Sequence, residues 1–336
     1  MTRRSTAYMT VDFGKDGKQV GSVNIPHSPH SDAWGATVLP IAVVKNGTGP
    51  TLILSGGNHG DEYEGPIALG ELIRDIDPGA IQGCLIVLPA LNIPAVMAGT
   101  RTSPVDGLNL NRTYPGNPEG TISQQISAFM NDVVYPHGDA FLDLHSGGSS
   151  LDILPSAIVE PALDPAHQKR NVEAVLAFDA PLTVVVSNLG ETRTSTASAV
   201  RAGLTTVGTE MGGGGTVGLE ALAICRRGIH NVLAHLGLVE NKSAVREDRT
   251  LFEVAGSQSY VLASGDGVFE PFHANGTEIS AGQPAGRVHF LDDPMRLPAE
   301  LIYRQDGIVY ARRQPGRVKP GNCCIVVASP FQGDLA

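Results

Sequence analysis

The chain has 336 residues, 42% of them hydrophobic, which is enough for one large or two moderate domains with a sizeable core. The formal net charge of −10 and the lack of a basic patch argue against a nucleic-acid partner. No apolar run approaches the roughly 20 residues that span a bilayer, and no signal-peptide pattern follows Met1. The four cysteines form no Cys-x-x-Cys pair, which suits buried thiols in a reducing compartment. We therefore expect a cytoplasmic protein without a membrane partner.

Secondary-structure signals divide the chain into three stretches. Residues 8–48 are rich in strand formers and turns, with a hairpin turn indicated at Lys15-Asp16-Gly17. From residue 51 to about 240, apolar runs of strand length alternate with helix-length segments, which indicates an α/β domain with a mixed, mostly parallel sheet flanked by helices. The predicted strands are 51–55, 84–89, 140–144, 151–154, 182–187 and 205–210, and the predicted helices are 65–76, 121–134, 164–178, 193–202 and 217–237.

The charged stretch 240–250 has no apolar face and indicates a linker. Beyond it, residues 251–331 contain short strand-like segments separated by glycine turns, which predicts a small β-barrel or β-sandwich. The sequence thus predicts an α/β domain over residues 1–245 and a small β domain over residues 246–336.

The glycine-rich turn GGNHGDEYEG at residues 56–65 is the most informative motif. It places His59 and Glu62 three residues apart at the end of a predicted strand, where α/β sheets build their sites. His145 follows the predicted strand 140–144 and precedes a Ser-Gly-Gly turn. Two imidazoles and a carboxylate suit Zn²⁺, whose catalytic sites take three protein ligands and leave a position for water. We therefore predict one zinc ion per chain, held by His59, Glu62 and His145.

A zinc hydrolase also needs a base that is not a metal ligand. Glu210 is the candidate, because a strand-like segment ends on this single carboxylate before the glycine run 212–215. Alternatively, Glu210 only caps the loop. The lack of a neighbouring lysine or arginine in the sequence favours a catalytic role.

A long connection rich in Gly, Pro and Asn, residues 99–116, lies between the two metal motifs. Such a loop inside a compact domain is usually functional. Its arginines, Arg101 and Arg112, are suited either to binding a carboxylate or to polarising a scissile carbonyl. Taken singly, each would more often be a solvated surface residue.

Together these elements resemble a known family. His59-x-x-Glu62, Arg101, Asn111-Arg112, His145 and Glu210 occur in the order of the zinc carboxypeptidase superfamily. More narrowly they resemble its succinylglutamate desuccinylase/aspartoacylase branch, which removes acyl groups from N-acylated amino acids. Within that branch, the motifs GTRTSPVDGLNLNRTYPG, DLHSGG and TTVGTEMGGGG are similar to those of the Nα-acetyl-L-2,4-diaminobutyrate deacetylases of ectoine degradation. The resemblance covers about residues 51–235, and residues 265–286 resemble the β domain that these enzymes append.

The resemblance implies a role for each motif residue. His59, Glu62 and His145 would bind zinc, Glu210 would act as general base and then acid, and Arg101 would stabilise the oxyanion. Asn111 and Arg112 would hold the α-carboxylate of the substrate. One position departs from the carboxypeptidase pattern: Asn109 stands where an aspartate braces a zinc histidine, and an amide oxygen contributes less to that bond than a carboxylate. The mobile tyrosine of the carboxypeptidases has no clear equivalent, with Tyr260 and Tyr303 as candidates.

The resemblance therefore implies a zinc-dependent amidohydrolase acting on a small N-acylated amino acid, with Nα-acetyl-L-2,4-diaminobutyrate as the preferred substrate. Asp61, Glu64 and Asp152 are candidates to meet the ammonium group of that substrate. Three alternatives remain: a deacylase of this branch with another substrate, a metallocarboxypeptidase, and an inert carboxylate-binding protein. Relatives of this kind also imply a homo-oligomer.

Overall fold

The centre of the molecule is built from strands that are covered on both faces. The computed structural model describes residues 5–240 and 250–333. Four strands pair parallel in the order β5-β4-β6-β9, and near-continuous apolar runs such as Leu52-Ile53-Leu54 are typical of strands buried on both sides. Their bounds are Thr51–Gly56 (β4), Gly83–Leu88 (β5), Ala140–Leu144 (β6) and Thr205–Gly213 (β9).

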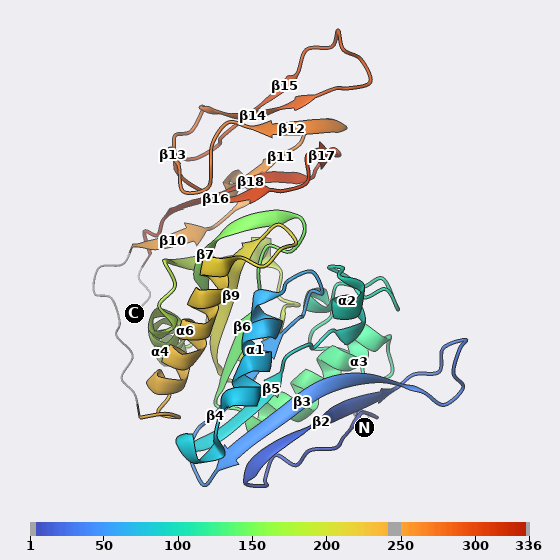
Figure 1. Cartoon of the computed structure of the whole chain (residues 1–336). Coiled ribbons are helices and arrows are strands. Elements are labelled where there is room, and N and C mark those ends of the chain that lie inside the picture. The colour runs from blue at the N-terminus through green and yellow to red at the C-terminus, as the bar shows by residue number, and fades with distance from the viewer. Residues whose placement is uncertain (1–4, 241–249, 334–336) are drawn as a thin grey trace.

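Further strands extend this sheet on both sides (Figure 1). The N-terminal strands add to β5 by antiparallel pairing, whereas on the other side β7 runs antiparallel to β9 and is followed by β8 and β10 in parallel. The added strands are Tyr8–Met9 (β1), Gly17–Pro26 (β2), Ala36–Asn46 (β3), Leu151–Val159 (β7), Leu182–Val186 (β8) and Leu251–Val254 (β10). The sheet is mixed, as predicted, but mostly parallel pairing holds only for its middle. The short β2–β3 connection explains the antiparallel pairing at the N-terminal side of the sheet, because a hairpin can join only antiparallel neighbours.

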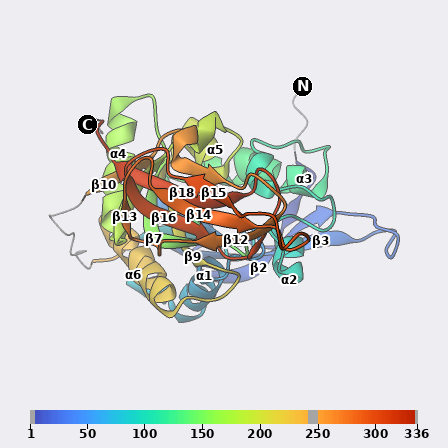
Figure 2. The same cartoon turned by 90° about the horizontal axis from the view of Figure 1, so that it is seen from above.

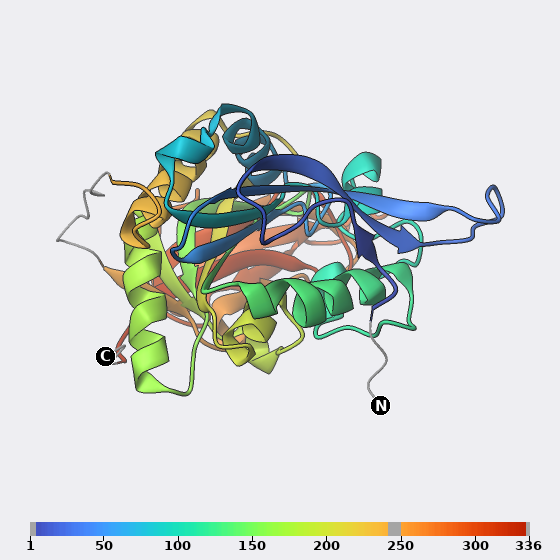
Figure 3. The same ribbon diagram turned by 90° about the horizontal axis from the view of Figure 1, so that it is seen from below.

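Helices cover both faces of the sheet. One face packs against α1, α4 and α6, and the other packs against α3 and α5. Figure 3 shows α3 from below, beside the N-terminal strands, where it contacts β2. These helices span Glu64–Asp75 (α1), Ile122–Phe129 (α3), Pro165–Phe178 (α4), Ser195–Arg201 (α5) and Leu219–His235 (α6).

The predicted strands and helices between residues 51 and 240 are confirmed, with small differences in extent. β7 continues to Val159, five residues beyond its predicted end, and β9 continues to Gly213, three residues beyond its predicted end. The last part of the predicted helix 121–134 is a π-helical turn at Met130–Val134. The short helix α2 (Ile93–Ala98) was not predicted. Within the described residues, no helix is long and apolar enough to cross a membrane.

The C-terminal strands form two layers around their own apolar core, above the helix-covered sheet in Figure 1 and in front of it in Figure 2. One layer is the four-stranded sheet β15-β14-β12-β17. The strands are Tyr260–Leu262 (β11), Gly267–Pro271 (β12), Glu278–Ile279 (β13), Pro284–His289 (β14), Ala299–Ile302 (β15), Gly307–Arg313 (β16), Arg317–Val318 (β17) and Cys323–Pro330 (β18).

This C-terminal part is hydrogen-bonded to the main sheet. β10 pairs with β8 and β18, and β16 pairs with β7, so backbone bonds cross the boundary predicted at residue 245. The division into two domains stays a prediction. Most of the predicted linker 240–250 lies outside the described residues.

A close contact between α4 and α6 gives a test of this packing. An alanine at Gly228 in α6 would place its methyl carbon 2.3 Å from Cζ of Phe178, a side chain with no exposure. Such overpacking typically costs about 1–3 kcal/mol, so we expect Gly228→Ala to lower the free energy of unfolding measured in denaturant.

Gly70→Ala in α1 is the matched control. There the nearest atom to the new methyl is Nη1 of Arg74 at 3.5 Å, the end of a flexible side chain. Alanine favours a helix over glycine by up to about 1 kcal/mol, so this variant should be unchanged or more stable. Equal effects of the two substitutions would contradict the packing described here.

Candidate metal centre

Neighbouring parallel strands deliver the candidate residues to one edge of the sheet. The turn after β4 carries His59 and Glu62, His145 follows β6 directly, and Glu210 lies in the last half of β9. Because parallel strands end at the same edge, residues far apart in the sequence meet there. The turn passes close against α2: a side chain at Gly60 would place its Cβ 1.9 Å from the carbonyl oxygen of Ala95. Glycine is therefore required for the approach that places His59.

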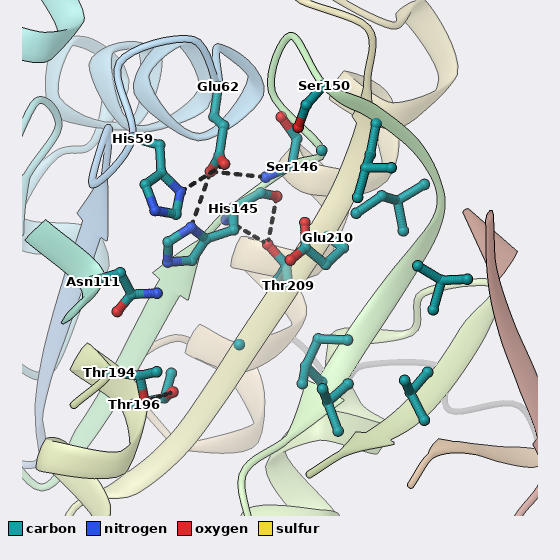
Figure 4. Close-up of a pocket in the computed structure, with 18 of the residues that line it drawn as sticks. His59, Glu62, Asn111, His145, Ser146, Ser150, Thr194, Thr196, Thr209 and Glu210 are labelled. Carbon is teal, nitrogen blue, oxygen red and sulfur yellow. Dashed lines mark hydrogen bonds and ion pairs between the residues drawn. The ribbon is translucent and has the colours of Figure 1, made fainter. Parts of the chain in front are cut away.

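His59, Glu62 and His145 form a compact, buried cluster (Figure 4). Nδ1 of His59 lies 2.7 Å from Oε1 of Glu62, and Nδ1 of His145 lies 2.9 Å from Oε2 of the same carboxylate. One potential ligand atom from each of the three residues lies within 4.8 Å of the others. The side chains present two imidazole nitrogens and a carboxylate to one point, which is a donor set that fits a zinc ion.

The outer nitrogen of each imidazole is fixed by a second polar group. Nε2 of His145 lies 2.9 Å from Oδ2 of Asp143, and Nε2 of His59 lies 3.1 Å from Oδ1 of Asn109. Such partners fix the tautomer and the ring orientation of metal-binding histidines, so Nδ1, which faces Glu62 in both rings, is the candidate ligand atom. Asn109 thus contacts the histidine that an aspartate braces in the carboxypeptidase pattern.

The charges of the cluster compensate one another. Burial alone would raise the pKa of Glu62, but the charges of His59 and His145 and their hydrogen bonds hold it well below its ordinary value. Burial opposes protonation of His145, yet Asp143 and Glu62 raise its pKa well above the ordinary value. Burial also lowers the pKa of His59. Glu62 is therefore an anion held between two imidazoles.

Glu210 differs from Glu62 in having a carboxylate oxygen without a protein partner. Its Oε2 is buried and makes no hydrogen bond within the described part of the chain. Burial, together with the negative charge of Glu62, raises the pKa of Glu210 to about 8. A carboxyl group with a pKa near neutrality can both accept and donate a proton.

Arginine and asparagine side chains from the long loop line the same pocket. Nη1 of Arg101 donates to Oε1 of Glu62 at 3.3 Å, and its side chain is 42% exposed. Oδ1 of Asn111 accepts from the backbone N–H of Ser195 at 2.8 Å, and its amide NH₂ group donates to no group among the described residues. Arg112 donates to the carbonyl oxygen of Asn111. The pocket thus brings all seven candidate residues together.

The pocket has a volume of about 350 Å³ and its wall includes the C-terminal strands. Tyr260 and Tyr310 both line it, and the hydroxyl of Tyr310 lies 2.6 Å from Oγ of Ser156. Tyr303, the other predicted tyrosine, instead lies in the C-terminal core beside His273. The sequence did not indicate Tyr310, because its position depends on the pairing of β16 with β7.

None of the three acidic residues expected near a substrate ammonium lines the pocket. Asp61 accepts from Ser149, Glu64 accepts from the N–H of Gly218, and Asp152 accepts from Asn275. These carboxylates fix loops and strands around the site. Glu160 lines the pocket instead, and the sequence analysis missed it. The available signal was the apolar run Ala157-Ile158-Val159 before it, which resembles the strand that precedes Glu210.

Comparison with known proteins agrees with this geometry. Residues 48–236 match the model of the succinylglutamate desuccinylase/aspartoacylase catalytic domain. The N-alpha-acetyl-L-2,4-diaminobutyric acid deacetylase of Halomonas elongata is 41% identical over 327 residues, covering 97% of this chain and 96% of that protein. The chain belongs to the succinylglutamate desuccinylase/aspartoacylase family.

Solved structures of this family superpose over nearly the whole chain. The product-bound ectoine utilization protein EutE (DoeB) of Ruegeria pomeroyi has a TM-score of 0.94 at 37% identity, covering 97% of this chain and 100% of that one. A succinylglutamate desuccinylase/aspartoacylase of Rhodobacter sphaeroides has a TM-score of 0.92 at 42% identity, with the same coverage. The similarity therefore includes the C-terminal strands as well as the catalytic domain.

The raised pKa of Glu210 predicts how pH affects the metal-free protein. Between the ordinary pKa of 4.5 and about 8, the unfolded chain releases the proton of Glu210 while the folded protein keeps it. The stability that Glu210 contributes is therefore present below about pH 4.5 and is lost as the pH rises toward 8. Gln at this position cannot ionise, so metal-free Glu210→Gln should lose less stability than the wild type between pH 5 and 8.

Denaturant unfolding in the presence of a chelator measures this difference. The wild-type midpoint should fall toward pH 8 relative to that of the variant. If both midpoints change in parallel, Glu210 does not carry the proposed shift.

Proposed function

We propose that this protein is a zinc-dependent amidohydrolase that converts Nα-acetyl-L-2,4-diaminobutyrate to L-2,4-diaminobutyrate and acetate. The observation that carries the proposal is the His59-Glu62-His145 cluster in one pocket with the unpartnered carboxylate of Glu210. The 41% identity to the Halomonas deacetylase over 97% of the chain supports the choice of substrate.

Zinc is the metal that this donor set fits best, with Nδ1 of His59, Nδ1 of His145 and the Glu62 carboxylate as its ligands. Bound there, zinc would lower the pKa of a water molecule toward 7 and polarise the acyl carbonyl group. Asp143 and Asn109 would orient the two imidazoles and increase their basicity.

Glu210 is the proposed proton carrier. Its free Oε2 would accept a proton from the attacking water and then donate it to the nitrogen of the departing amine. The positive charge of a metal at the cluster would lower the pKa of Glu210 from about 8 toward the range suited to a base. A buried carboxylate oxygen with no hydrogen bond in the described part of the chain is available for both transfers.

Arg101, Asn111 and Arg112 would hold the substrate and the developing charge. The guanidinium of Arg101 beside Glu62 is suited to stabilising the oxyanion that forms on the acyl oxygen. The free amide donor of Asn111 and the guanidinium of Arg112 would bind the α-carboxylate. These donors would fix the amide bond at the metal end of the pocket.

The wall that the C-terminal strands add to the pocket favours a small substrate over a peptide. Tyr260, Tyr310, Val254 and Val326 from the C-terminal strands close one side of it, where a carboxypeptidase needs an open cleft for a chain. The presence of Glu210 with the three candidate ligands also argues against an inert binding protein. A homo-oligomeric state and a cytoplasmic location stay predictions of the sequence.

The metal and the base can be tested together. We expect the purified protein to carry about one Zn²⁺ per chain, and Glu210→Gln to keep that zinc while losing activity by roughly 10²-fold or more, the scale of general acid–base catalysis. Elemental analysis and the rate of acetate release measure both. Active protein without a divalent metal, or a variant with near-normal turnover, would contradict the proposed mechanism.

Substrate choice is the next test. The kcat/KM for Nα-acetyl-L-2,4-diaminobutyrate should exceed those for N-acetylaspartate and N-succinylglutamate. Arg112→Ala should chiefly raise KM, because a carboxylate-binding group contacts the ground state and the transition state alike. A preference for either acidic substrate would overturn the diaminobutyrate assignment and leave the zinc deacylase proposal standing.

A further inference from the structure

The pocket has a second polar end away from the metal cluster. Figure 4 shows Thr194 and Thr196 at the opposite side of the cavity from His59 and Glu62. Oγ1 of Thr196 donates to Oε2 of Glu160 at 2.8 Å, and Glu160 also lines the cavity. Its Oε1 makes no hydrogen bond or ion pair among the residues that the structure describes. A carboxylate is therefore held in place with one oxygen available to a ligand.

Glu160 is the acidic pocket residue that the proposed catalytic steps do not use. Glu62, Glu160 and Glu210 are the carboxylates that line the pocket in the described part of the chain. Glu62 is held between two imidazoles, and Glu210 is the proposed base. The nearby cation Arg201 donates to the carbonyl oxygen of Thr192 and forms no ion pair with Glu160 in the described residues.

One short segment contacts a residue at each of the two proposed substrate-binding ends. The backbone N–H of Ser195 donates to Asn111, where the α-carboxylate is proposed to bind, and the next residue, Thr196, donates to Glu160. The adjacent residues Ser195 and Thr196 thus hold Asn111 and Glu160, respectively. Groups anchored by neighbouring residues would suit a substrate whose cation lies only a few bonds from its α-carbon. Ile158 and Val186 of the pocket wall would contact the intervening methylenes.

We propose that Glu160 binds the side-chain ammonium group of the substrate and thereby selects a short cationic side chain over neutral and acidic ones. This rests on the function proposed above and names the group that determines its specificity. An ammonium ion would pair with the free oxygen of Glu160. A side-chain carboxylate, as in N-acetylaspartate, would be repelled by it, so one residue both attracts the correct substrate and rejects the acidic substrates of the family.

The environment of Glu160 is consistent with this role. Burial raises the pKa of its carboxyl group, so its protein surroundings disfavour the charged form. A bound cation would stabilise the charged form.

The test compares two substrates of nearly the same shape. Nα-acetylnorvaline carries a methyl group where Nα-acetyl-L-2,4-diaminobutyrate carries the ammonium. Because a hydrogen bond to a charged group contributes the equivalent of about 10- to 100-fold in binding, the zinc-loaded wild type should prefer the diaminobutyrate substrate by that factor in kcat/KM. Glu160→Gln should bring the ratio close to one while keeping its zinc.

Asp152→Asn is the matched control. Asp152 lies on β7, the strand that precedes Glu160, and its carboxylate accepts from Asn275 instead of lining the pocket. This variant should keep the wild-type substrate ratio. A lost preference in Asp152→Asn, with an unchanged ratio in Glu160→Gln, would overturn the assignment.

A second variant keeps the charge and moves it. Glu160→Asp withdraws the carboxylate by one methylene, so it should favour Nα-acetylornithine, whose ammonium lies one methylene further out. We expect the ratio of Nα-acetylornithine to Nα-acetyl-L-2,4-diaminobutyrate activity to rise by about tenfold, which is the effect of roughly 1.4 kcal/mol. This result does not depend on the folding of the glutamine variant.

The outcomes separate the two proposals. A wild type that hydrolyses acetylated amino acids, with a substrate ratio unchanged in both Glu160 variants, overturns the role of Glu160 alone. A zinc-loaded wild type that hydrolyses none of these amides overturns the proposed function and the role of Glu160 with it.

Discussion

The sharing of one buried carboxylate between two imidazoles is the interaction on which the site depends. Each oxygen of Glu62 faces Nδ1 of a different histidine, and the backbone N–H of Ser146 donates to the same group. A carboxylate this deeply buried requires such partners, because an unpaired charge in a protein interior is strongly unfavourable. The structure therefore holds three residues from two separate turns in a fixed arrangement before any metal is considered.

The arrangement of the strands explains how these residues meet. β4 and β6 are parallel neighbours, so the turn with His59 and Glu62 and the residue His145 leave the same edge of the sheet. Asp143, the single polar residue of β6, accepts from Ser55 of β4 and from Ser195 of α5 while it orients His145. Asp143 therefore orients His145 and also connects β4 to α5. The orientation of the imidazole thus depends on how this strand and this helix are packed.

The sequence predicted the part of the site that local patterns encode. His59, Glu62, His145 and Glu210 each stand at or near the end of an apolar run beside glycines, and a parallel sheet brings such ends together without further information. The central strands were predicted for the same reason. Mostly parallel pairing was not a safe inference, because the pairing partners of β7, β10 and β16 are not encoded in their own periodicity.

The residues that the sequence missed depend on long-range pairing. Tyr310 lines the pocket because β16 pairs with β7, and Glu160 follows a strand that is longer than its apolar pattern suggested. Asp61 and Glu64 were better placed in the sequence, next to the metal motif, yet both carboxylates turn away to fix Ser149 and Gly218. Closeness along the chain did not predict which acid faces the cavity, since the side-chain directions depend on the packing of the glycine-rich turns.

The N-terminal end of α5 links the metal centre to the proposed specificity site. Ser195 contacts both Asp143 and Asn111, and the side chain of Thr194 caps the helix by accepting from the N–H of Ala197. The adjacent Thr196 holds Glu160. A shift of this one turn would therefore move three side chains together. They are Asp143, which orients His145, Asn111, which is proposed to bind the α-carboxylate, and Glu160, which is proposed to bind the ammonium group. The proposed substrate selection and the proposed metal geometry are therefore coupled, because a single helix end contacts Asp143, Asn111 and Glu160.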